Sequence, residues 1–234
     1  MSQNPSRERP LLAVLIDADN VPAKHAGAIL REITSIGEPA LRRVYGDWAS
    51  ARLKPWNDQL LSLGLVAVQE TANTKGKNAS DIGLVIDAMD ILHGGRFDGF
   101  VLVSSDSDFT ALANRLRENG LMVIGIGEKK TPEALRNVVN RFIFIENLED
   151  SPENTPREGA EKSEKALPLI KAAMKKMEPV DDWYSLGHLG NIIIAAHTDF
   201  DTRTYGHSKL SQLVQAIPML EYRKNNNGQV RLKP

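Results

Sequence analysis

The sequence predicts an α/β fold, a mostly parallel sheet with helices on both faces, followed by a small C-terminal winged helix-turn-helix domain. Short apolar runs alternate with helical segments up to residue 148, which is typical of a parallel sheet covered by helices. A polar stretch at 149–162 then breaks the alternation. Beyond it, amphipathic helical segments lead to a hairpin pattern, which is the order of elements in a winged helix module.

The predicted strands of the first part are short runs rich in β-branched and aromatic residues. The run at 99–103 carries no charge, so it is expected to be buried on both faces of the sheet. The apolar run at 11–16 has the same character. In chain order the predicted strands are 11–16, 40–45, 65–69, 99–103, 121–126 and 142–145.

The helices between these strands are predicted from apolar residues at helical spacing and from start and stop residues. Pro22 is tolerated in a first helical turn, so a helix can begin just after it. Gly64, the Gly94-Gly95 pair and the Asn119-Gly120 pair are typical of helix ends. The predicted helices are 23–35, 52–63, 81–92, 109–118 and 132–139.

Changes in composition predict the domain boundaries. Residues 1–10 are polar, lack the apolar core of a signal peptide and are expected to be disordered. Residues 11–148 form the first domain, and 149–162, rich in Pro, Glu, Ser and Asn, form a linker. Residues 163–234 form the second domain, with helices at 167–177, 186–196 and 208–216 and two strands within 219–232 around a polar turn at 225–228.

Composition excludes several classes of protein. The chain has 234 residues, of which 41% are hydrophobic and 25% charged, as in globular proteins. It has no cysteine, so disulfides and thiolate metal sites are excluded and any metal must bind oxygen or histidine. No apolar run approaches the roughly 20 residues of a membrane span, and we expect a cytoplasmic protein. The net charge is -1, but residues 161–234 carry 11 Lys and Arg against 8 Asp and Glu.

Aspartates follow two of the predicted strands at the point where each strand ends. Asp17 follows the strand at 11–16, and Asp106 and Asp108 follow the strand at 99–103. The carboxyl ends of parallel strands meet at the edge of the sheet where ligands bind. Asp81 opens the helix that follows the third strand, so it can also reach this edge.

Carboxylates gathered in this way repel one another unless a cation lies between them. Mg²⁺ and Mn²⁺ prefer oxygen ligands, and such ions promote hydrolysis of phosphodiester bonds. On the helix, Asp81 shares the apolar face that is expected to pack on the sheet. Asp87 and Asp90 lie on other sides of this helix and are expected to face solvent.

Each candidate residue also has an ordinary structural interpretation. Asp19, Ser107 and Asp108 could each cap a helix, and Asn20 could cap a helix or orient a metal-bound water. Trp48 and Trp56 could stack on bases, but core packing is the better interpretation. Lys75 and Lys77 could be solvated, and His25 and His93 show no metal-ligand spacing and are interpreted as structural.

Three motifs in order resemble the NYN domain, in the bacterial branch related to LabA-like proteins. They are LIDADN at 15–20, KGKNASD at 75–81 running into LVIDAM, and VSSDSDF at 103–109. The resemblance covers about residues 11–146, and the family is similar to PIN and FLAP nucleases. It implies a metal-dependent ribonuclease with Asp17, Asp81, Asp106 and Asp108 as catalytic metal ligands, Asn20 beside them, and Lys75, Lys77 and Asn78 in contact with RNA. Many members have glycine where this chain has Ser105, and we expect little consequence.

The C-terminal part resembles the OST-HTH (LOTUS) domain over about residues 162–233. The resemblance rests on LGHL at 186–189, DFDTRTYGHSKL at 199–210 and IPMLE at 217–221. It implies RNA binding, or binding of a helicase in some animal members. Tyr205-Gly206 is expected to start a helix whose amino end holds phosphates, and Tyr205 is interpreted as partly structural. The candidate RNA contacts are Arg203, Tyr205, Lys209, Arg223 and Lys224.

Three functions are compatible with these residues. The first is a Mg²⁺- or Mn²⁺-dependent ribonuclease whose tail recruits RNA. The second is a non-catalytic RNA-binding regulator or adaptor. The third is a phosphatase of the haloacid-dehalogenase type, since Asp17-Ala18-Asp19 matches its nucleophile motif, although that function explains neither Asp81 nor the tail. The resemblance also allows a homodimer and a protein partner that binds through the OST-HTH domain.

Overall fold

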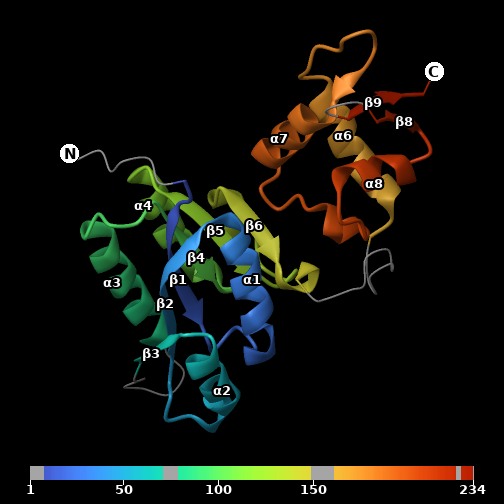
Figure 1. The fold of residues 1–234 in the computed structure, drawn as a ribbon. Helices are drawn as coiled ribbons and strands as arrows, with labels where there is room; N and C mark the ends of the chain where they lie inside the picture. Colours follow the sequence, from blue (N-terminus) through green and yellow to red (C-terminus); the bar gives the residue numbers. More distant parts are fainter. Residues whose placement is uncertain (1–7, 71–78, 149–160, 225–227, 234) are drawn as a thin grey trace. The chain divides into compact units, whose positions relative to one another are not determined.

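The first part of the chain folds around a six-stranded sheet in which every neighbouring pair of strands is parallel (Figure 1). The structure is a computed structural model that describes residues 8–70, 79–148, 161–224 and 228–233. Two compact units divide after Glu149, and each is described by itself. The strands of the sheet are β1 (Leu11–Asp17), β2 (Glu38–Gly46), β3 (Val66–Gln69), β4 (Gly99–Val103), β5 (Met122–Gly127) and β6 (Arg141–Phe144).

The strand order is β3-β2-β1-β4-β5-β6, so the direction of strand addition reverses between β1 and β4. From β1 the chain builds outward through β2 and β3, returns to β4 beside β1, and builds outward on the other side. At such a reversal the loops at the carboxyl ends of the two central strands diverge and leave room for a ligand. Asp17 ends β1, and Asp106 lies in the loop that follows β4.

Helices cover both faces of the sheet (Figure 1). Apolar side chains of β1 alternate between the faces, with Val14 and Ile16 on one side and Ala13 and Leu15 on the other. All of them are fully buried, as predicted for a strand covered on both sides. The first face packs on α1 (Ala26–Ile36) and α2 (Lys54–Ser62), and the second on α3 (Ala79–His93), α4 (Thr110–Glu118) and α5 (Glu133–Val138).

Several helices begin with a tight turn that the sequence analysis assigned to the helix itself. The predicted helix at 23–35 starts with a 3₁₀ turn, and its α-helical part begins at Ala26. The same arrangement precedes α2 and α4. The 3₁₀ turns are η1 (Ala23–His25), η2 (Ala51–Leu53), η3 (Ser107–Phe109), η4 (Ile145–Asn147), η5 (Ser163–Ala166) and η6 (Thr202–Tyr205).

The expectation that Asp87 faces solvent is wrong. Its carboxylate accepts hydrogen bonds from the Arg43 guanidinium and from the Tyr45 hydroxyl, both on β2. Burial, followed by the hydrogen bond to Asp87, raises the pKa of Tyr45 well above its usual range, so the phenol stays protonated and donates. Asp87 therefore ties α3 to the sheet, whereas Asp90 is exposed as expected.

The second unit has three α-helices and a three-stranded antiparallel sheet in the order β7-β9-β8 among its described residues. Ile170, Leu189, Leu213 and Val230 are fully buried in its core. The helices and the β8–β9 pair agree with the predicted winged helix, and β7 adds a short strand that was not predicted. The elements are α6 (Leu167–Met174), α7 (Leu186–Ala196), α8 (Leu210–Ala216), β7 (Tyr184–Ser185), β8 (Leu220–Arg223) and β9 (Gln229–Leu232).

The expectation that Tyr205-Gly206 starts a helix is also wrong. Tyr205 ends η6, and Gly206 follows in the left-handed region with φ of 80°. Glycine adopts this conformation without the strain that a side chain would cause, so the motif terminates a turn. The next helix, α8, begins at Leu210 and has 7 residues.

None of the helices in the described part of the chain combines the length and the apolar character that crossing a membrane requires.

Candidate functional site

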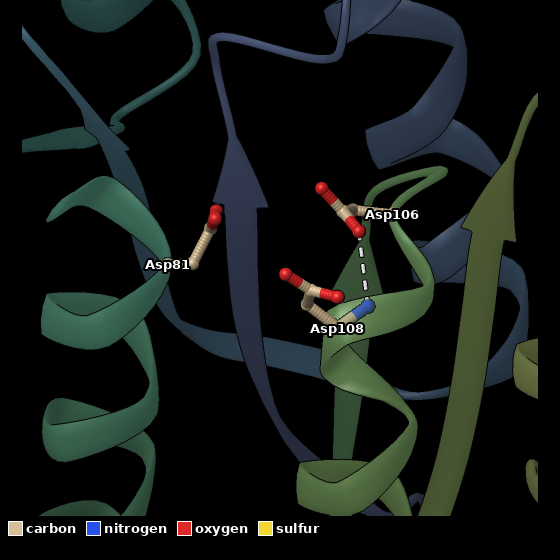
Figure 2. A group of neighbouring side chains, drawn as sticks. All are labelled: Asp81, Asp106 and Asp108. Atoms are coloured by element: carbon tan, nitrogen blue, oxygen red, sulfur yellow. Dashed lines mark hydrogen bonds between the residues drawn. The ribbon is translucent and has the colours of Figure 1, made fainter. Parts of the chain in front are cut away.

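Three carboxylates from two separate segments meet at the carboxyl edge of the sheet (Figure 2). Asp81 comes from the first turn of α3, and Asp106 and Asp108 come from the turn after β4. One oxygen of each lies within 4.8 Å of the others, which is close enough for a single cation to bind all three. The sequence analysis predicted this meeting for all three residues.

Local structure explains the position of each carboxylate. Asp106 is the N-cap of η3, and its Oδ1 accepts a hydrogen bond of 2.9 Å from the backbone N–H of Asp108. The cap is thus Asp106, whereas the sequence analysis considered Ser107 and Asp108 for this role. Leu84 and Ala88 on α3 are buried against the sheet, so Asp81, on the same face of the helix, points toward the strand ends.

Asp17 lies next to this group, and its carboxylate accepts hydrogen bonds from neighbouring residues. It is 1% exposed, and its Oδ2 accepts hydrogen bonds from the Asn20 amide at 2.6 Å and the Ser104 hydroxyl at 2.8 Å. Its Oδ1 accepts from the backbone N–H groups of Asp19 and Asn20. Both oxygens are therefore occupied, and Asp17 is outside the group formed by Asp81, Asp106 and Asp108.

The negative charges of Asp81 and of the neighbouring aspartates at this edge of the sheet repel one another. Burial, and then the charges of Asp17, Asp106 and Asp108, raise the pKa of Asp81 to about 6. Burial also raises the pKa of Asp17, while the hydrogen bonds from Asn20 and Ser104 oppose that rise. Removing the repulsion requires a proton or a cation at the group.

The donor set fits a hard divalent cation. Carboxylate oxygens are the ligands of Mg²⁺ and Mn²⁺, and Asp106 and Asp108 are more accessible than Asp17. Among the described residues, Asp81, Asp106 and Asp108 are the group of acidic or imidazole side chains that could hold a metal ion.

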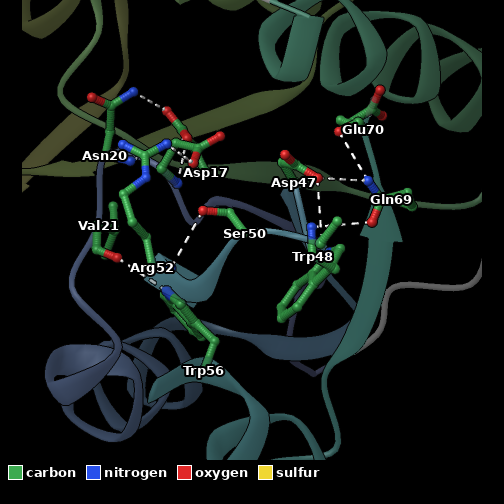
Figure 3. Close-up of polar contacts among 12 residues, drawn as sticks. Asp17, Asn20, Val21, Asp47, Trp48, Ser50, Arg52, Trp56, Gln69 and Glu70 are labelled. Atoms are coloured by element: carbon green, nitrogen blue, oxygen red, sulfur yellow. Dashed lines mark hydrogen bonds and ion pairs between the residues drawn. The ribbon is translucent and has the colours of Figure 1, made fainter. Parts of the chain in front are cut away.

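Asn20 does not cap the helix that follows it, which was one of its two predicted roles. The N-cap position of η1 belongs to Pro22, and Asn20 instead fixes the carboxylate of Asp17 (Figure 3). Asp19, next to it, forms an ion pair with Arg52 in which Nη2 lies 3.2 Å from Oδ1. Both polar side chains of the turn after β1 therefore have partners within the protein.

The two tryptophans interpreted as core residues donate side-chain hydrogen bonds to the protein backbone. Trp56 is buried and donates its indole N–H to the carbonyl of Val21, and Trp48 donates to the carbonyl of Val68 (Figure 3). His93 lies in a hydrogen bond with the carbonyl of Met89, and His25 lies in η1.

Lys75, Lys77 and Asn78, predicted to contact RNA, lie outside the described residues. The structure gives different surroundings to the candidates in the second unit. Arg203 forms an ion pair with the largely buried Asp201, and Tyr205 packs against Phe200, with its pKa raised by burial. Lys209, Arg223 and Lys224 are exposed.

Arg223 has a second contact, with the ring of Trp183. The Cζ atom of Arg223 lies 4.3 Å from the centre of the indole ring, and that of Arg231 lies 4.7 Å from it. These are cation–π distances, so part of the role of Arg223 is to pack the buried Trp183. Lys209 and Lys224 are then the candidates whose charge is most available to a phosphate.

The sequence analysis missed the connection that Ser104 makes. Its hydroxyl donates to Asp17 and accepts from the backbone N–H of Asp106 at 3.1 Å, so it joins the turn after β1 to the turn after β4. A hydroxyl directly at the end of a fully apolar strand was the available signal. Ser105, the residue that replaces glycine, accepts a hydrogen bond from the backbone N–H of Glu128.

Comparison with known proteins gives two family matches. A family model described as the NYN domain matches residues 11–146, and one described as the OST-HTH/LOTUS domain matches residues 161–232. No curated protein matches the chain.

Two solved structures are similar to it. One is a protein of unknown function from Vibrio parahaemolyticus, with a TM-score of 0.50 and 20% sequence identity over 59% of this chain and 94% of that one. The other is MurG of Acinetobacter baumannii, with a TM-score of 0.38 and 13% identity over 89% of this chain and 70% of that one. At 20% sequence identity, the first match concerns the fold alone. The TM-score of 0.38 of the second match is too low to indicate a shared fold.

Proposed function

The chain belongs to the NYN domain family, which is a family of PIN-like nucleases, and carries an OST-HTH/LOTUS domain, a type that binds RNA; from this we propose that it is a metal-dependent ribonuclease. It hydrolyses RNA phosphodiester bonds at the edge of the parallel sheet, and its second domain holds the RNA. The observation that carries the proposal is the close approach of Asp81, Asp106 and Asp108.

The proposed roles follow from the contacts of each residue. Asp81, Asp106 and Asp108 would hold a Mg²⁺ or Mn²⁺ ion through one carboxylate oxygen each. Such an ion, when bound, promotes attack by water on the phosphorus and stabilises the charge that develops on the phosphate. Asp17 adds negative charge beside these ligands, and Asn20 and Ser104 hold its carboxylate in place.

Positioning of the RNA is assigned to cations. Lys75, Lys77 and Asn78, which precede Asp81 in the sequence, remain proposed RNA contacts. In the second unit the proposed contacts are Lys209, Arg223 and Lys224, with a lesser role for Tyr205 and for Arg203, whose charge is neutralised by Asp201. Phosphate contacts of this kind hold the strand without reading its sequence.

The geometry of Asp17 argues against the phosphatase alternative. A nucleophilic carboxylate must present a lone pair to the phosphorus, whereas Asp17 is buried and both of its oxygens accept hydrogen bonds from the protein.

The proposal is tested by cleavage of single-stranded and structured RNA by the purified full-length protein with Mn²⁺. Asp106→Asn should lower the rate at least about 100-fold, because it removes a charge from the cation site. An asparagine oxygen still accepts the hydrogen bond from the Asp108 N–H, so η3 stays capped. Asp81→Asn should have the same effect.

The matched control is Asp90→Asn, which removes the same charge from an exposed position of α3 and should leave the rate unchanged. If the wild-type protein cleaves neither RNA while it still binds both, the chain is a non-catalytic RNA-binding regulator. If Asp106→Asn cleaves at the wild-type rate, the acidic group is not the active site.

A further inference from the structure

A pocket of about 370 Å³ opens at the turn that follows β1. Its volume lies within the range of small-ligand sites, about 300–1,000 Å³. Figure 3 shows Asn20, Val21, Arg52 and Trp56, which line it. One wall comes from the connection between β1 and α1 and the other from η2 and the start of α2; the lining residues used below are Asp19, Asn20, Lys24, Arg52, Pro55 and Trp56.

The inner part of the pocket is apolar and fixed. Val21, Leu53 and Trp56 are each at most 3% exposed. The indole N–H of Trp56 donates to the Val21 carbonyl at 3.2 Å, which fixes the ring between the two walls. Pro55, exposed on α2, also lines the pocket and presents a rigid apolar side chain. The exposed Pro22 and Pro55 supply the accessible apolar surface above this buried layer, and a flat heteroaromatic ring can lie against it.

Polar groups line the same pocket. Asp19, Asn20, Lys24 and Arg52 combine two cations with a carboxylate and an amide. The side chain of Arg52 is 76% exposed, and its ion pair with Asp19 is of the surface type that contributes little to stability. The guanidinium can therefore turn toward a phosphate at small cost.

Asn20 connects this pocket to the acidic group. It lines the pocket, and its amide donates to Asp17, whose charge in turn acts on Asp81. Asn20 thus links the pocket to the aspartates at the edge of the sheet, so an RNA strand bound at both would pass this residue. We propose that the pocket binds one nucleoside of the RNA strand adjoining the phosphate that is cleaved, with Lys24 and Arg52 holding the next phosphate. The proposal rests on the ribonuclease function for its substrate class.

The kinetic test compares the double variant Lys24→Ala/Arg52→Ala with Lys54→Ala in the full-length protein. Lys54 is an exposed cation on the same helix start and does not line the pocket. With a short RNA, the double variant should raise KM about tenfold and leave kcat within about twofold, because it removes contacts to a part of the substrate that does not react. Lys54→Ala should change neither constant. An unchanged KM in the double variant, or an equal rise of KM with Lys54→Ala, would refute the proposal that this pocket binds a nucleoside of the substrate.

A second test needs no turnover. Adenosine or cytidine 5′-monophosphate is titrated, with EDTA present, while the indole ¹H–¹⁵N signals of the tryptophans are followed by NMR and that of Trp56 is assigned with Trp56→Phe. The Trp56 signal should shift and saturate, the Trp183 signal should stay in place, and the double variant should lose the shift. Binding at an unrelated surface would leave Trp56 in place and refute the proposal.

The two tests separate this proposal from the ribonuclease function. A saturable Trp56 shift in a protein that cleaves no RNA would leave the nucleoside pocket standing and reject the nuclease. If cleavage depends on Asp106 but the Trp56 signal does not shift and the double variant leaves KM unchanged, the ribonuclease function stands and the nucleoside pocket is rejected.

Discussion

Asp81 should give cation binding a pH dependence, because its pKa is raised to about 6 by burial and by the neighbouring aspartates. Below this pH a proton competes with the cation for the carboxylate. We therefore expect Mn²⁺ affinity to be about tenfold lower at pH 5 than at pH 7, measured by calorimetry. Asp81→Asn should bind more weakly at both values and lose the step near pH 6. A wild-type affinity that is constant from pH 5 to 7 would contradict the raised pKa.

The same pKa affects the stability of the metal-free protein. The unfolded chain has the ordinary pKa of 3.8, so between that value and about 6 the folded protein keeps a proton that the unfolded chain has lost. The stabilising contribution of Asp81 is complete below pH 3.8 and is lost as the pH rises through about 6. In urea unfolding with EDTA, the wild-type protein should therefore lose stability relative to Asp81→Asn over this interval.

At the level of single residues, the sequence predicted which aspartates lie at the carboxyl edge of the sheet. It did not predict the hydrogen bonds that position them there. Asp17, Asp106 and Asp108 could be placed because each follows an apolar strand, where parallel strands expose their carboxyl ends. The hydrogen bond from Ser104 to Asp17 joins residues 87 positions apart. No local pattern specifies such a contact, so the sequence placed Asp17 at the site without indicating that its oxygens accept hydrogen bonds from the protein.

At the level of elements, α3 is held on the sheet by a polar contact. We expect Asp87→Ala to lower the free energy of unfolding by about 1–3 kcal/mol, because the buried hydroxyl of Tyr45 and the guanidinium of Arg43 lose their shared acceptor. Since Asp81 belongs to the same helix, Mn²⁺ affinity should fall as well. Urea unfolding and calorimetry measure the two effects. Asp90→Ala, an exposed change on α3, should stay within about 0.5 kcal/mol of wild type, and an equal loss in both variants would contradict this role of Asp87.

Arg223 and Lys224, neighbours at the end of β8, allow an effect on packing to be distinguished from an effect on RNA binding. Arg223→Ala removes one of the two guanidinium groups from the ring of Trp183, a loss of about 0.5–1 kcal/mol that should lower the thermal midpoint of this unit by about 2–8 °C. Lys224→Ala should leave the midpoint unchanged and weaken RNA binding. Calorimetry and RNA titration distinguish the two. If Arg223→Ala weakened RNA binding without any thermal change, its contact with Trp183 would be incidental.

Regular elements were predictable where a single pattern dominates. The strands β1, β4 and β5 are uninterrupted apolar runs, and their buried positions follow from that alone. Helix starts were less predictable, because 3₁₀ and α-helical turns share the same spacing over a few residues. The Tyr205-Gly206 pair was misassigned because glycine ends turns as readily as it precedes helices, and its φ of 80° comes from the fold of the unit.

At the level of the whole molecule, the two domains should contribute to different steps. Removing residues 162–234 should weaken RNA affinity and reduce its salt dependence, since the exposed Lys209, Arg223 and Lys224 are lost with them. Each lost phosphate contact lowers the slope of log K against log salt by about 0.7 for a single strand. Cleavage at saturating RNA should change less, because the acidic group lies in the first unit. Equal affinity and slope in the shortened protein would remove the second domain from RNA binding.

The strand order of the sheet has a consequence for biosynthesis. Because β1 lies beside β4, the hydrogen bond from Ser104 joins Asp17 to a turn that leaves the ribosome only after β2, β3 and α3. At about 5–20 residues per second, the nascent polypeptide spends on the order of ten seconds with Asp17 made and Asp108 still untranslated. Throughout that time it stays close to messenger and ribosomal RNA without the full set of carboxylates proposed to hold the cation, so the proposed cleavage cannot begin before the turn after β4 is made.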